Sequence, residues 1–218
     1  EAPFFPDVVY EPWHSNLDVL KKRTSAYDGV IVDSYFAVEE TFGAIKSPLK
    51  IAIDDFERMV YPVDLVIRPS IYRWGKNTRQ HAKVYEGPEF IVVNETLRKE
   101  FSRNPESSAL FISAGGGSNI HALETFCLAS KLAKLRDVHV VCGGAYEIFR
   151  GKTLSEEFHV YGTLSSSQYA KVASHCGFAL TACGTSLSEM AYAGFPAVGV
   201  MISEDQYYIG KGFYEIGY

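Results

Sequence analysis

Short apolar runs alternate with amphipathic stretches along this chain of 218 residues. Runs such as "DGVIVDSY", "LKIAIDD" and "VHVVCGGA" are rich in β-branched residues and end in turn-forming residues. Continuous apolar runs of this length are typical of buried strands in a parallel sheet. Stretches such as "LDVLKKRTSA" and "NIHALETFCLASKLAKL" have the periodicity of helices. The succession of strand, helix and strand predicts an α/β fold of Rossmann-like units with right-handed connections.

Polar residues mark two helix starts and one linker. Asn119 or Ser118 is suited to be the N-cap of one helix, and Ser165 to Ser167 open another. The segment "RNPESSA" breaks the pattern, so we expect a partial N-terminal domain over residues 1–104 and a C-terminal nucleotide-binding domain over 105–218. The first shows only three strand patterns, which predicts a fragment lacking roughly 60 upstream residues.

Composition narrows the classes of partner. The chain is 47% hydrophobic and 22% charged, with a net charge of -5, which argues against nucleic acid as a partner. Its four cysteines form no CxxC pattern, and three of them lie in apolar segments that favour buried free thiols, so we expect a cytoplasmic protein. No apolar run is long enough to predict stable membrane insertion. The oligomeric state is left open.

Two turns between strand and helix carry small residues that suit a phosphate. In "FISAGGGSN", Gly115 and Gly116 precede a helix, where free amides and the helix dipole favour an anion. The order GxGxxG and a Walker lysine are lacking, and a tight turn without a ligand is the alternative. In "TACGTSLSEM", Thr185 and Ser186 open another helix, and Glu189 either complements its dipole or accepts hydrogen bonds from a ribose diol.

Further loops fall on the same edge of the predicted sheet, because ligands of open α/β sheets bind at the carboxyl ends of the strands. These loops contain Gly143-Gly144, Thr163-Leu164 and Asp205-Gln206. Together the loops predict a site for a nucleoside diphosphate. No cofactor is expected. The six histidines have no metal-binding spacing, so we expect them on the surface or in the core and expect no metal.

The order of "ISAGGGSN", "VCGGA", "YGTLSSSQYAKVASHCGFALTACGTSLSEMAYAGFPAVGV" and "SEDQ" resembles the C-terminal half of GT-B proteins such as the MurG glycosyltransferases. The earlier segments "DGVIVDSYF", "IAIDDFERMVYPVDLVIRPSIY" and "YEGPEFIVVNETLRKEF" resemble the PseG and SpsG hydrolases of pseudaminic acid biosynthesis. The resemblance covers nearly the whole chain. It implies a GT-B-like fold and the release of UDP from a 2,4-diacetamido-2,4,6-trideoxy sugar.

By this resemblance the turns at Gly116 and Ser186 would hold the pyrophosphate, Leu164 would meet uracil and Glu189 would bind ribose. The expected nucleotide-binding residues are Gly115, Gly116, Leu164, Thr185, Ser186, Leu187, Glu189 and Gln206. Tyr35 would lie at the sugar. Asp33, Asp54 and Asp55 end strands and would shape the cleft, with turn formation and helix capping as the alternative.

The chain departs from the family pattern at several positions. The family's Asp-His-Tyr is Asp33-Ser34-Tyr35 here, its Asn-Gln is Asp205-Gln206, and its usual arginine is Asn94. The family's glycine-rich loop with its histidine would precede Glu1. Asp205 and Tyr35 are therefore the expected catalytic residues of this chain, Asp205 as the base. The alternatives to a UDP-sugar hydrolase are a glycosyltransferase and a nucleotide-sugar-binding protein without activity.

Overall fold

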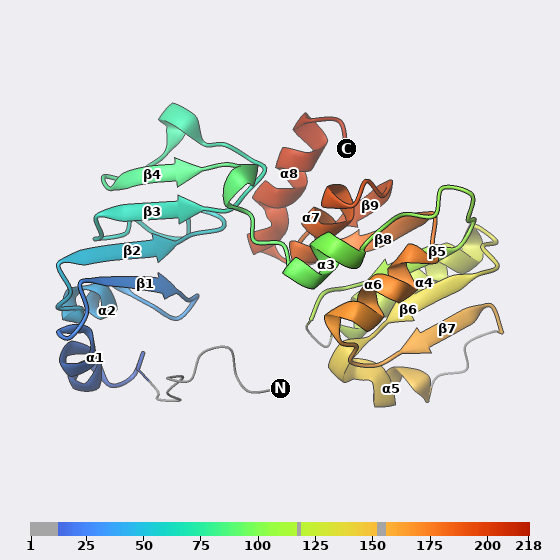
Figure 1. Cartoon of the computed structure of the whole chain (residues 1–218), viewed down its shortest axis with the longest axis horizontal. Coiled ribbons are helices and arrows are strands. Elements are labelled where there is room, and N and C mark those ends of the chain that lie inside the picture. The colour runs from blue at the N-terminus through green and yellow to red at the C-terminus, as the bar shows by residue number, and fades with distance from the viewer. Residues whose placement is uncertain (1–12, 117–118, 152–155) are drawn as a thin grey trace. The chain divides into compact units, whose positions relative to one another are not determined.

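The computed structural model describes residues 13–116, 119–151 and 156–218. The chain divides into two compact units, each with its own parallel sheet (Figure 1). The first unit comprises Glu1–Pro69 and Trp74–Phe90, and the second comprises Ser70–Arg73 and Ile91–Tyr218. The structure therefore has the α/β class with two Rossmann-like sheets that the alternating pattern predicts.

The first unit is built on a four-stranded sheet in the order β1-β2-β3-β4. Its elements are α1 (Leu17–Thr24), β1 (Gly29–Asp33), α2 (Glu39–Ala44), β2 (Leu49–Ile53), β3 (Leu65–Arg68), the 3-10 helix η1 (Gly75–Asn77), β4 (Lys83–Glu86) and the 3-10 helix η2 (Pro88–Phe90). Val32, Ala52 and Val66 are in register on adjacent strands and are buried with Phe42 and Ile45. This apolar row forms the core of the unit.

The sequence predicts three strands in this half, and the structure has a fourth. The additional strand, β4, has the sequence "KVYE", in which Val84 is half-buried and Tyr85 is exposed. It lies at the edge of the sheet and pairs only with β3 among the described strands. An edge strand needs no continuous apolar run, so the apolar pattern does not reveal it.

The second unit has a five-stranded parallel sheet in the order β7-β6-β5-β8-β9. Its elements are α3 (Glu95–Glu100), β5 (Leu110–Ser113), α4 (Ile120–Leu132), β6 (Val138–Val141), η3 (Gly143–Ala145), α5 (Tyr146–Arg150), β7 (Phe158–Tyr161), α6 (Ser166–Ser174), β8 (Phe178–Ala182), α7 (Thr185–Tyr192), β9 (Ala197–Val200), η4 (Glu204–Gln206) and α8 (Tyr207–Glu215). The chain adds strands outward from β5, then returns to add β8 on its other side. The strand order thus reverses between β5 and β8, where such sheets bind ligands.

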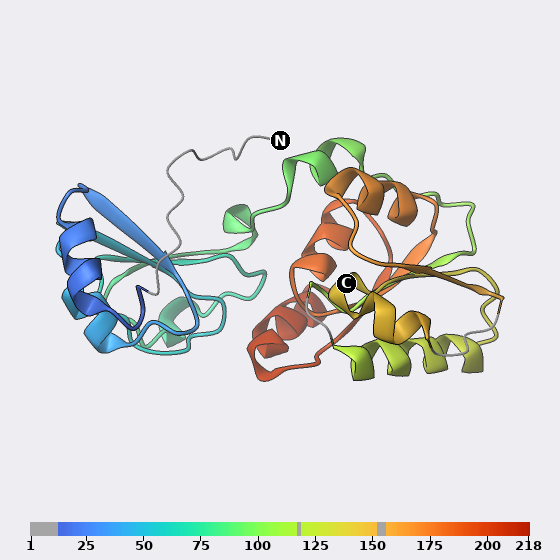
Figure 2. The same cartoon turned by 90° about the horizontal axis from the view of Figure 1, so that it is seen from below.

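Apolar side chains cover both faces of this sheet. On one face, Leu110 and Ile112 pack with Leu123 and Phe126 of α4. On the other face, Phe111 packs with α3, α6 and α7 through buried residues such as Ala170 and Met190. Figure 2 shows α4 on one side of the strands and α3 and α6 on the other. Burial on both faces explains why β5 and β6 are uninterrupted apolar runs.

Two predicted helix starts are confirmed. The Asn119 side chain accepts a hydrogen bond from the Ala122 amide at 3.0 Å, so Asn119 is the N-cap of α4. Ser165 caps α6 and forms a capping box with Gln168. Ser118 lies outside the described residues. All four cysteines are buried free thiols, where the sequence predicts three. None of the described helices has the length and apolar character needed to cross a membrane.

The contact pattern assigns α3 to the second unit, ahead of the predicted boundary between residues 104 and 105. Leu97 and Phe101 are buried in the core of that unit, and Phe101 packs on Phe195 with ring centroids 5.1 Å apart. The segment "RNPESSA" is therefore a connection within the second unit. The Asn104 amide donates to the Cys176 carbonyl there, at 3.4 Å.

A short segment from the first half of the sequence, Ser70–Arg73, also belongs to the second unit. It packs on α8, where the Tyr72 and Tyr208 rings lie 5.2 Å apart and the Lys211 ammonium donates to the Tyr72 hydroxyl at 3.2 Å. A Cβ at Gly212 would lie 2.5 Å from the Tyr72 amide nitrogen. Only glycine allows α8 to approach this segment so closely.

Candidate functional site

A cavity of about 300 Å³ lies at the carboxyl ends of the strands in the second unit. It is lined by the residues that follow β5, β6 and β7 and by α3, α6 and α7: Asn94, Leu97, Ser113, Gly115, Gly116, Val141, Gly143, Gly144, Gly162, Thr163, Leu164, Ser166, Tyr169, Ser186 and Glu189. This is the edge on which the sequence predicts a ligand site. The volume is at the lower end of the range for small-molecule sites.

Glycine backbone forms one wall of the cavity. Gly115 has a φ of +87°, in the left-handed region, and a Cβ there or at Gly116 would meet no atom of the described residues within 4 Å. In the neighbouring loop, a Cβ at Gly143 would lie 4.0 Å from the Gly116 carbonyl oxygen. The loops after β5 and β6 therefore expose bare backbone toward the same space, which lets a ligand approach the peptide groups closely.

Another wall is the start of α7, which lacks the side-chain cap that α4 and α6 have. Its N-cap is Gly184, so no side chain accepts from the first amides of the helix. The Leu187 and Ser188 amides bond to the Gly184 carbonyl. The amides of Thr185 and Ser186 come before them and point out of the helix end, where an external acceptor can bind. The helix dipole favours an anion at this position.

Glu189 lies one helical turn after Ser186, and both residues line the cavity. Burial raises the pKa of the Glu189 carboxyl from 4.5 to about 7. A carboxylate that is removed from water and faces a cavity lacks hydrogen-bond donors, so it gains most from a ligand that carries hydroxyl groups. The residue combines the position and the chemistry needed to accept hydrogen bonds from a diol.

Tyr169 of α6 also lines the cavity, close to Ser113, Ser186 and Glu189. Its hydroxyl is buried and no side chain meets it at full hydrogen-bonding geometry. Burial raises the pKa of Tyr169 to about 12 and the charge of Glu189 acts in the same direction, whereas the Ser186 and Ser113 hydroxyls lie close enough to lower it. Tyr169 is thus a neutral donor held next to Glu189.

The structure brings five of the predicted nucleotide-binding residues into this cavity: Gly115, Gly116, Leu164, Ser186 and Glu189. The other three lie beside it and are not among the described lining residues. Thr185 is exposed, and the Leu187 side chain is buried against Cys183 and Phe213. Gln206 accepts a hydrogen bond from the Ile202 amide at 3.1 Å, and its Nε2 would lie 3.9 Å from a Cβ at Gly184.

Asp205, the predicted base, lies in η4 and is half-buried. It is not among the described residues that line the cavity. Sequence reasoning also missed several residues that do line it, among them the polar residues Tyr169 and Ser113. Ser113 ends β5 directly before the glycine loop, so its place in the strand could have indicated it. Tyr169 lies one turn into α6 after the cap at Ser165, and that helical spacing was the available signal.

Predicted site residues of the first unit gather at the carboxyl ends of β1 and β2. Asp33 is the last residue of β1 and is exposed. Tyr35 is 56% exposed, donates a hydrogen bond to Asp55 Oδ2 at 2.8 Å and packs near the Phe56 ring. Tyr35 and Asp55 are thus joined directly by a hydrogen bond, and the role of Tyr35 at a sugar stays a prediction.

Asp54 has a different environment. It is 2% exposed and accepts hydrogen bonds from the Arg68 guanidinium at 3.1 Å and from the Arg58 amide at 3.1 Å. Arg68 is itself fully buried and also bonds Glu57 at 2.9 Å. Glu57 has a φ of +58° and lies in the same turn. The turn-forming alternative therefore describes Asp54, which holds the loop after β2.

Neither the known protein-family models nor the curated proteins contain a match to this chain. The geometry of the cavity therefore carries the functional argument, and the resemblance to PseG and MurG proteins remains a prediction.

Proposed function

We propose that this chain binds a UDP-linked sugar and takes part in its hydrolysis to UDP and the free sugar. A single observation carries the proposal: Ser186 and Glu189 line one cavity together with bare glycine backbone. Both residues belong to the start of α7, which has no side-chain cap. That combination suits a ligand with an anionic group next to a diol, which describes a ribonucleoside diphosphate. The sequence resemblance supports uracil as the base.

In this proposal each part of the nucleotide has its own contact. The diphosphate binds the amides at Gly116 and at the start of α7, where the helix dipole favours negative charge. Glu189 accepts hydrogen bonds from the ribose hydroxyls, and the backbone at Leu164 meets uracil. The modest cavity volume, about 300 Å³, supports a nucleotide in this space with the sugar extending out of it.

Hydrolysis requires water to attack C1 of the sugar. A bond forms between the water oxygen and C1, the bond from C1 to the diphosphate oxygen breaks, and UDP leaves with the bonding electrons. The amides at Gly116 and Ser186 stabilise the charge that develops on the diphosphate. A general base takes the proton of the attacking water. We propose Asp205 as the acidic candidate in this chain, with Tyr35 at the sugar.

The proposal includes a cytoplasmic location, because four buried free thiols are typical of a reducing compartment. It includes UDP-sugar as the partner and nonulosonic acid or surface polysaccharide biosynthesis as the setting, both on the strength of the resemblance.

Calorimetric titration with UDP, and with CMP and AMP as controls, tests the nucleotide site. The proposal predicts micromolar binding of UDP and at least tenfold weaker binding of the controls. Equal binding of all three, or none, would contradict it. UDP release from a UDP-linked diacetamido-trideoxy sugar in buffer alone then supports hydrolysis. Release only after an acceptor sugar or lipid is added would instead support a glycosyltransferase, and tight binding without any release a binding protein.

A further inference from the structure

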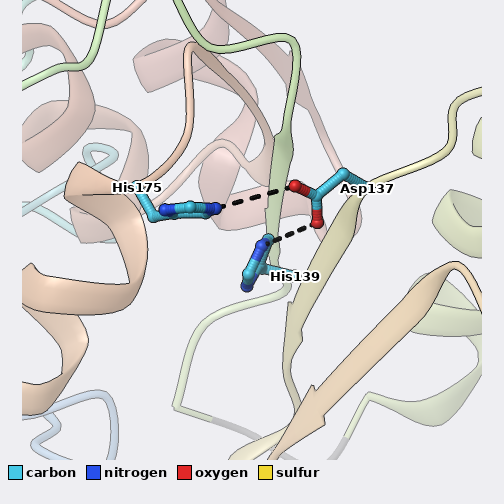
Figure 3. Close-up of side chains that lie close together, drawn as sticks. All are labelled: Asp137, His139 and His175. Atoms are coloured by element: carbon cyan, nitrogen blue, oxygen red, sulfur yellow. Dashed lines mark ion pairs between the residues drawn. The ribbon is translucent and has the colours of Figure 1, made fainter.

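A second group of polar side chains lies at the opposite edge of the five-stranded sheet, near the amino ends of its strands. Asp137 directly precedes β6, His139 is the second residue of β6 and His175 is the C-cap of α6. Figure 3 shows both imidazoles directed toward the Asp137 carboxylate. Asp137 and His139 lie two residues apart at the start of β6 but His175 comes from the end of α6, so no metal-binding spacing appears between the histidines and the prediction of ordinary histidines overlooked the cluster.

The distances within the cluster suit a single metal ion. His139 Nε2 lies 2.9 Å from Asp137 Oδ1, and His175 Nε2 lies 3.6 Å from Asp137 Oδ2. One ligand atom from each residue lies within 4.8 Å of those of the other two. Ligands bound tetrahedrally to Zn²⁺ at about 2.0–2.1 Å are roughly 3.3–3.4 Å apart. Small side-chain rotations would therefore bring all three atoms into coordination distance.

The directions of the side chains agree with this reading. His139 Nε2 and Asp137 Oδ1 are buried and 2.9 Å apart. Burial lowers the pKa of His139, and Asp137 is close enough to act in the opposite direction and raise it. Yet among the described residues neither atom has a partner that meets the full angular criteria of a hydrogen bond. Two ligands of one ion show this arrangement, because their lone pairs converge on the ion rather than on each other. The His139 and His175 rings are inclined by 64°, with centroids 5.1 Å apart, so they approach the carboxylate from different sides.

Neighbouring residues hold His139 in a suitable orientation. Its other ring nitrogen, Nδ1, lies 2.9 Å from the Tyr161 hydroxyl. A hydrogen bond donated from Nδ1 would leave the lone pair on Nε2 free for a metal, which is the usual arrangement of a metal-binding histidine. His159 stacks on His139 with ring centroids 4.7 Å apart, and its Nε2 lies 3.3 Å from Asp137 Oδ1. His159 thus contacts the Asp137 carboxylate as well as the His139 ring.

The cluster is open to solvent on one side. The His139 side chain is only 9% exposed, but those of Asp137 and His175 are 40% and 60% exposed. An ion can therefore enter without unfolding the unit, and water can complete its coordination. Two imidazole nitrogens with one carboxylate suit Zn²⁺, whereas Mg²⁺ and Ca²⁺ prefer oxygen ligands alone.

We propose that Asp137, His139 and His175 bind one Zn²⁺ ion, with water as a further ligand. The ion would fasten the C-terminal end of α6 to the start of β6. The opposite end of α6 carries Ser166 and Tyr169, which line the candidate cavity. The zinc site therefore acts on the stability of the helix and takes no part in chemistry at the nucleotide.

The test measures zinc binding by the full chain, made without a polyhistidine tag and freed of bound metal by EDTA treatment and dialysis. Calorimetry should give one Zn²⁺ per chain, EDTA should reverse the accompanying rise in Tm, and Mg²⁺ should produce neither effect. Co²⁺ in place of Zn²⁺ should give the visible absorption of a low-symmetry nitrogen and oxygen site. The proposal predicts at least tenfold weaker zinc binding by Asp137→Asn and His175→Gln.

The His175 side chain is exposed and the Asp137 side chain is 40% exposed, so both variants should fold even if His139→Ala does not. His121→Ala is the matched control, because His121 is 98% exposed and pairs only with Glu124 among the ion pairs recorded for it. It should bind zinc like the unaltered chain. Absence of binding, or equal affinity in His175→Gln and the unaltered chain, would overturn the proposal. Neither result depends on whether the chain binds UDP.

Discussion

Ser186 and Glu189 lie one helical turn apart at the start of α7, and both face the cavity at the carboxyl edge of the five-stranded sheet. The first residue belongs to a helix end whose amides attract an anion. The second is a carboxyl group whose pKa burial raises to about 7. A ligand that satisfies both must carry negative charge and hydroxyl groups a short distance apart, which is why the two residues are best tested together.

Replacing Glu189 should weaken nucleotide binding. We expect Glu189→Ala to bind UDP about 10- to 100-fold more weakly, the loss of about 1.5–3 kcal/mol expected for hydrogen bonds to a charged group. Calorimetry measures the change. Glu147→Gln is the matched control, because Glu147 is an exposed residue of α5 outside the cavity. An unchanged dissociation constant in Glu189→Ala would remove the ribose assignment.

The Glu189 carboxyl should lower the stability of the folded chain by an amount that depends on pH. Because the pKa of Glu189 rises from 4.5 to about 7 on folding, the folded chain holds this proton more tightly than the unfolded chain. The shift corresponds to at most roughly 3 kcal/mol, and partial exposure reduces this to roughly 1–2 kcal/mol.

The carboxyl is protonated in both states below pH 4.5, so Glu189→Gln should then match the unaltered chain. Above that pH the variant should be more stable than the unaltered chain. The difference in the free energy of unfolding should grow between pH 4.5 and 7 and stay constant above pH 7. Urea unfolding at pH 4, 6 and 8 measures it. A variant less stable than the unaltered chain at pH 8 would show that a native partner already compensates the charge.

Two of the glycines after β5, Gly115 and Gly116, should respond differently to alanine. A Cβ at Gly116 meets no neighbour, so Gly116→Ala should change stability by less than about 0.5 kcal/mol while its methyl group weakens UDP binding about tenfold. Gly115 has a φ of +87°, so Gly115→Ala should cost about 1–2 kcal/mol of stability. Thermal unfolding and titration of both variants separate the effects. Equal UDP affinity in Gly116→Ala would exclude close backbone contact with the ligand.

The buried ion pairs of Arg68 should be important for the first unit. Arg68→Met leaves the Asp54 and Glu57 carboxylates without their buried cation, which typically costs about 3–5 kcal/mol. Arg79 also pairs with Glu57, but its side chain is 63% exposed, so Arg79→Met should cost no more than about 1 kcal/mol.

Tryptophan fluorescence during urea unfolding can follow both variants. The only tryptophans, Trp13 and Trp74, belong to the first unit, and the Trp74 ring lies 4.4 Å from the Arg68 guanidinium carbon. Similar losses of unfolding free energy in Arg68→Met and Arg79→Met would show that the buried ion pairs stabilise the unit no more than the exposed one.

The strands of the second sheet were predictable because β5 and β6 are buried on both faces and consist of apolar residues throughout. β4 was not, since it lies at an edge where only alternate residues need burial. The sequence pattern also did not reveal that the second unit resumes after Phe90, for a related reason. Leu97 and Phe101 indicate a buried helix face, but the pattern does not say which sheet covers it.

The glycine loops and Glu189 could be placed in the site from sequence, because the carboxyl ends of parallel strands meet at one edge. For Tyr169 the helical spacing after Ser165 indicated only the N-terminal end of α6, and it is the packing of α6 on the sheet that brings the hydroxyl to Glu189. The same reason applies to His139 and His175. Their approach depends on where β6 and the end of α6 meet, and no spacing along the chain encodes that meeting.

Gly212 and the segment Ser70–Arg73 have a consequence for how the polypeptide is divided. The chain enters the second unit at Ser70, leaves it after Arg73 and returns at Ile91. The two units are therefore interleaved in sequence, although each has its own core. A polypeptide begun at Ile91 would lose the residues that cover Gly212 and stack on Tyr208. Proteolysis after Phe90 would likewise release a C-terminal fragment with an uncovered α8, so a single cut cannot yield two intact halves.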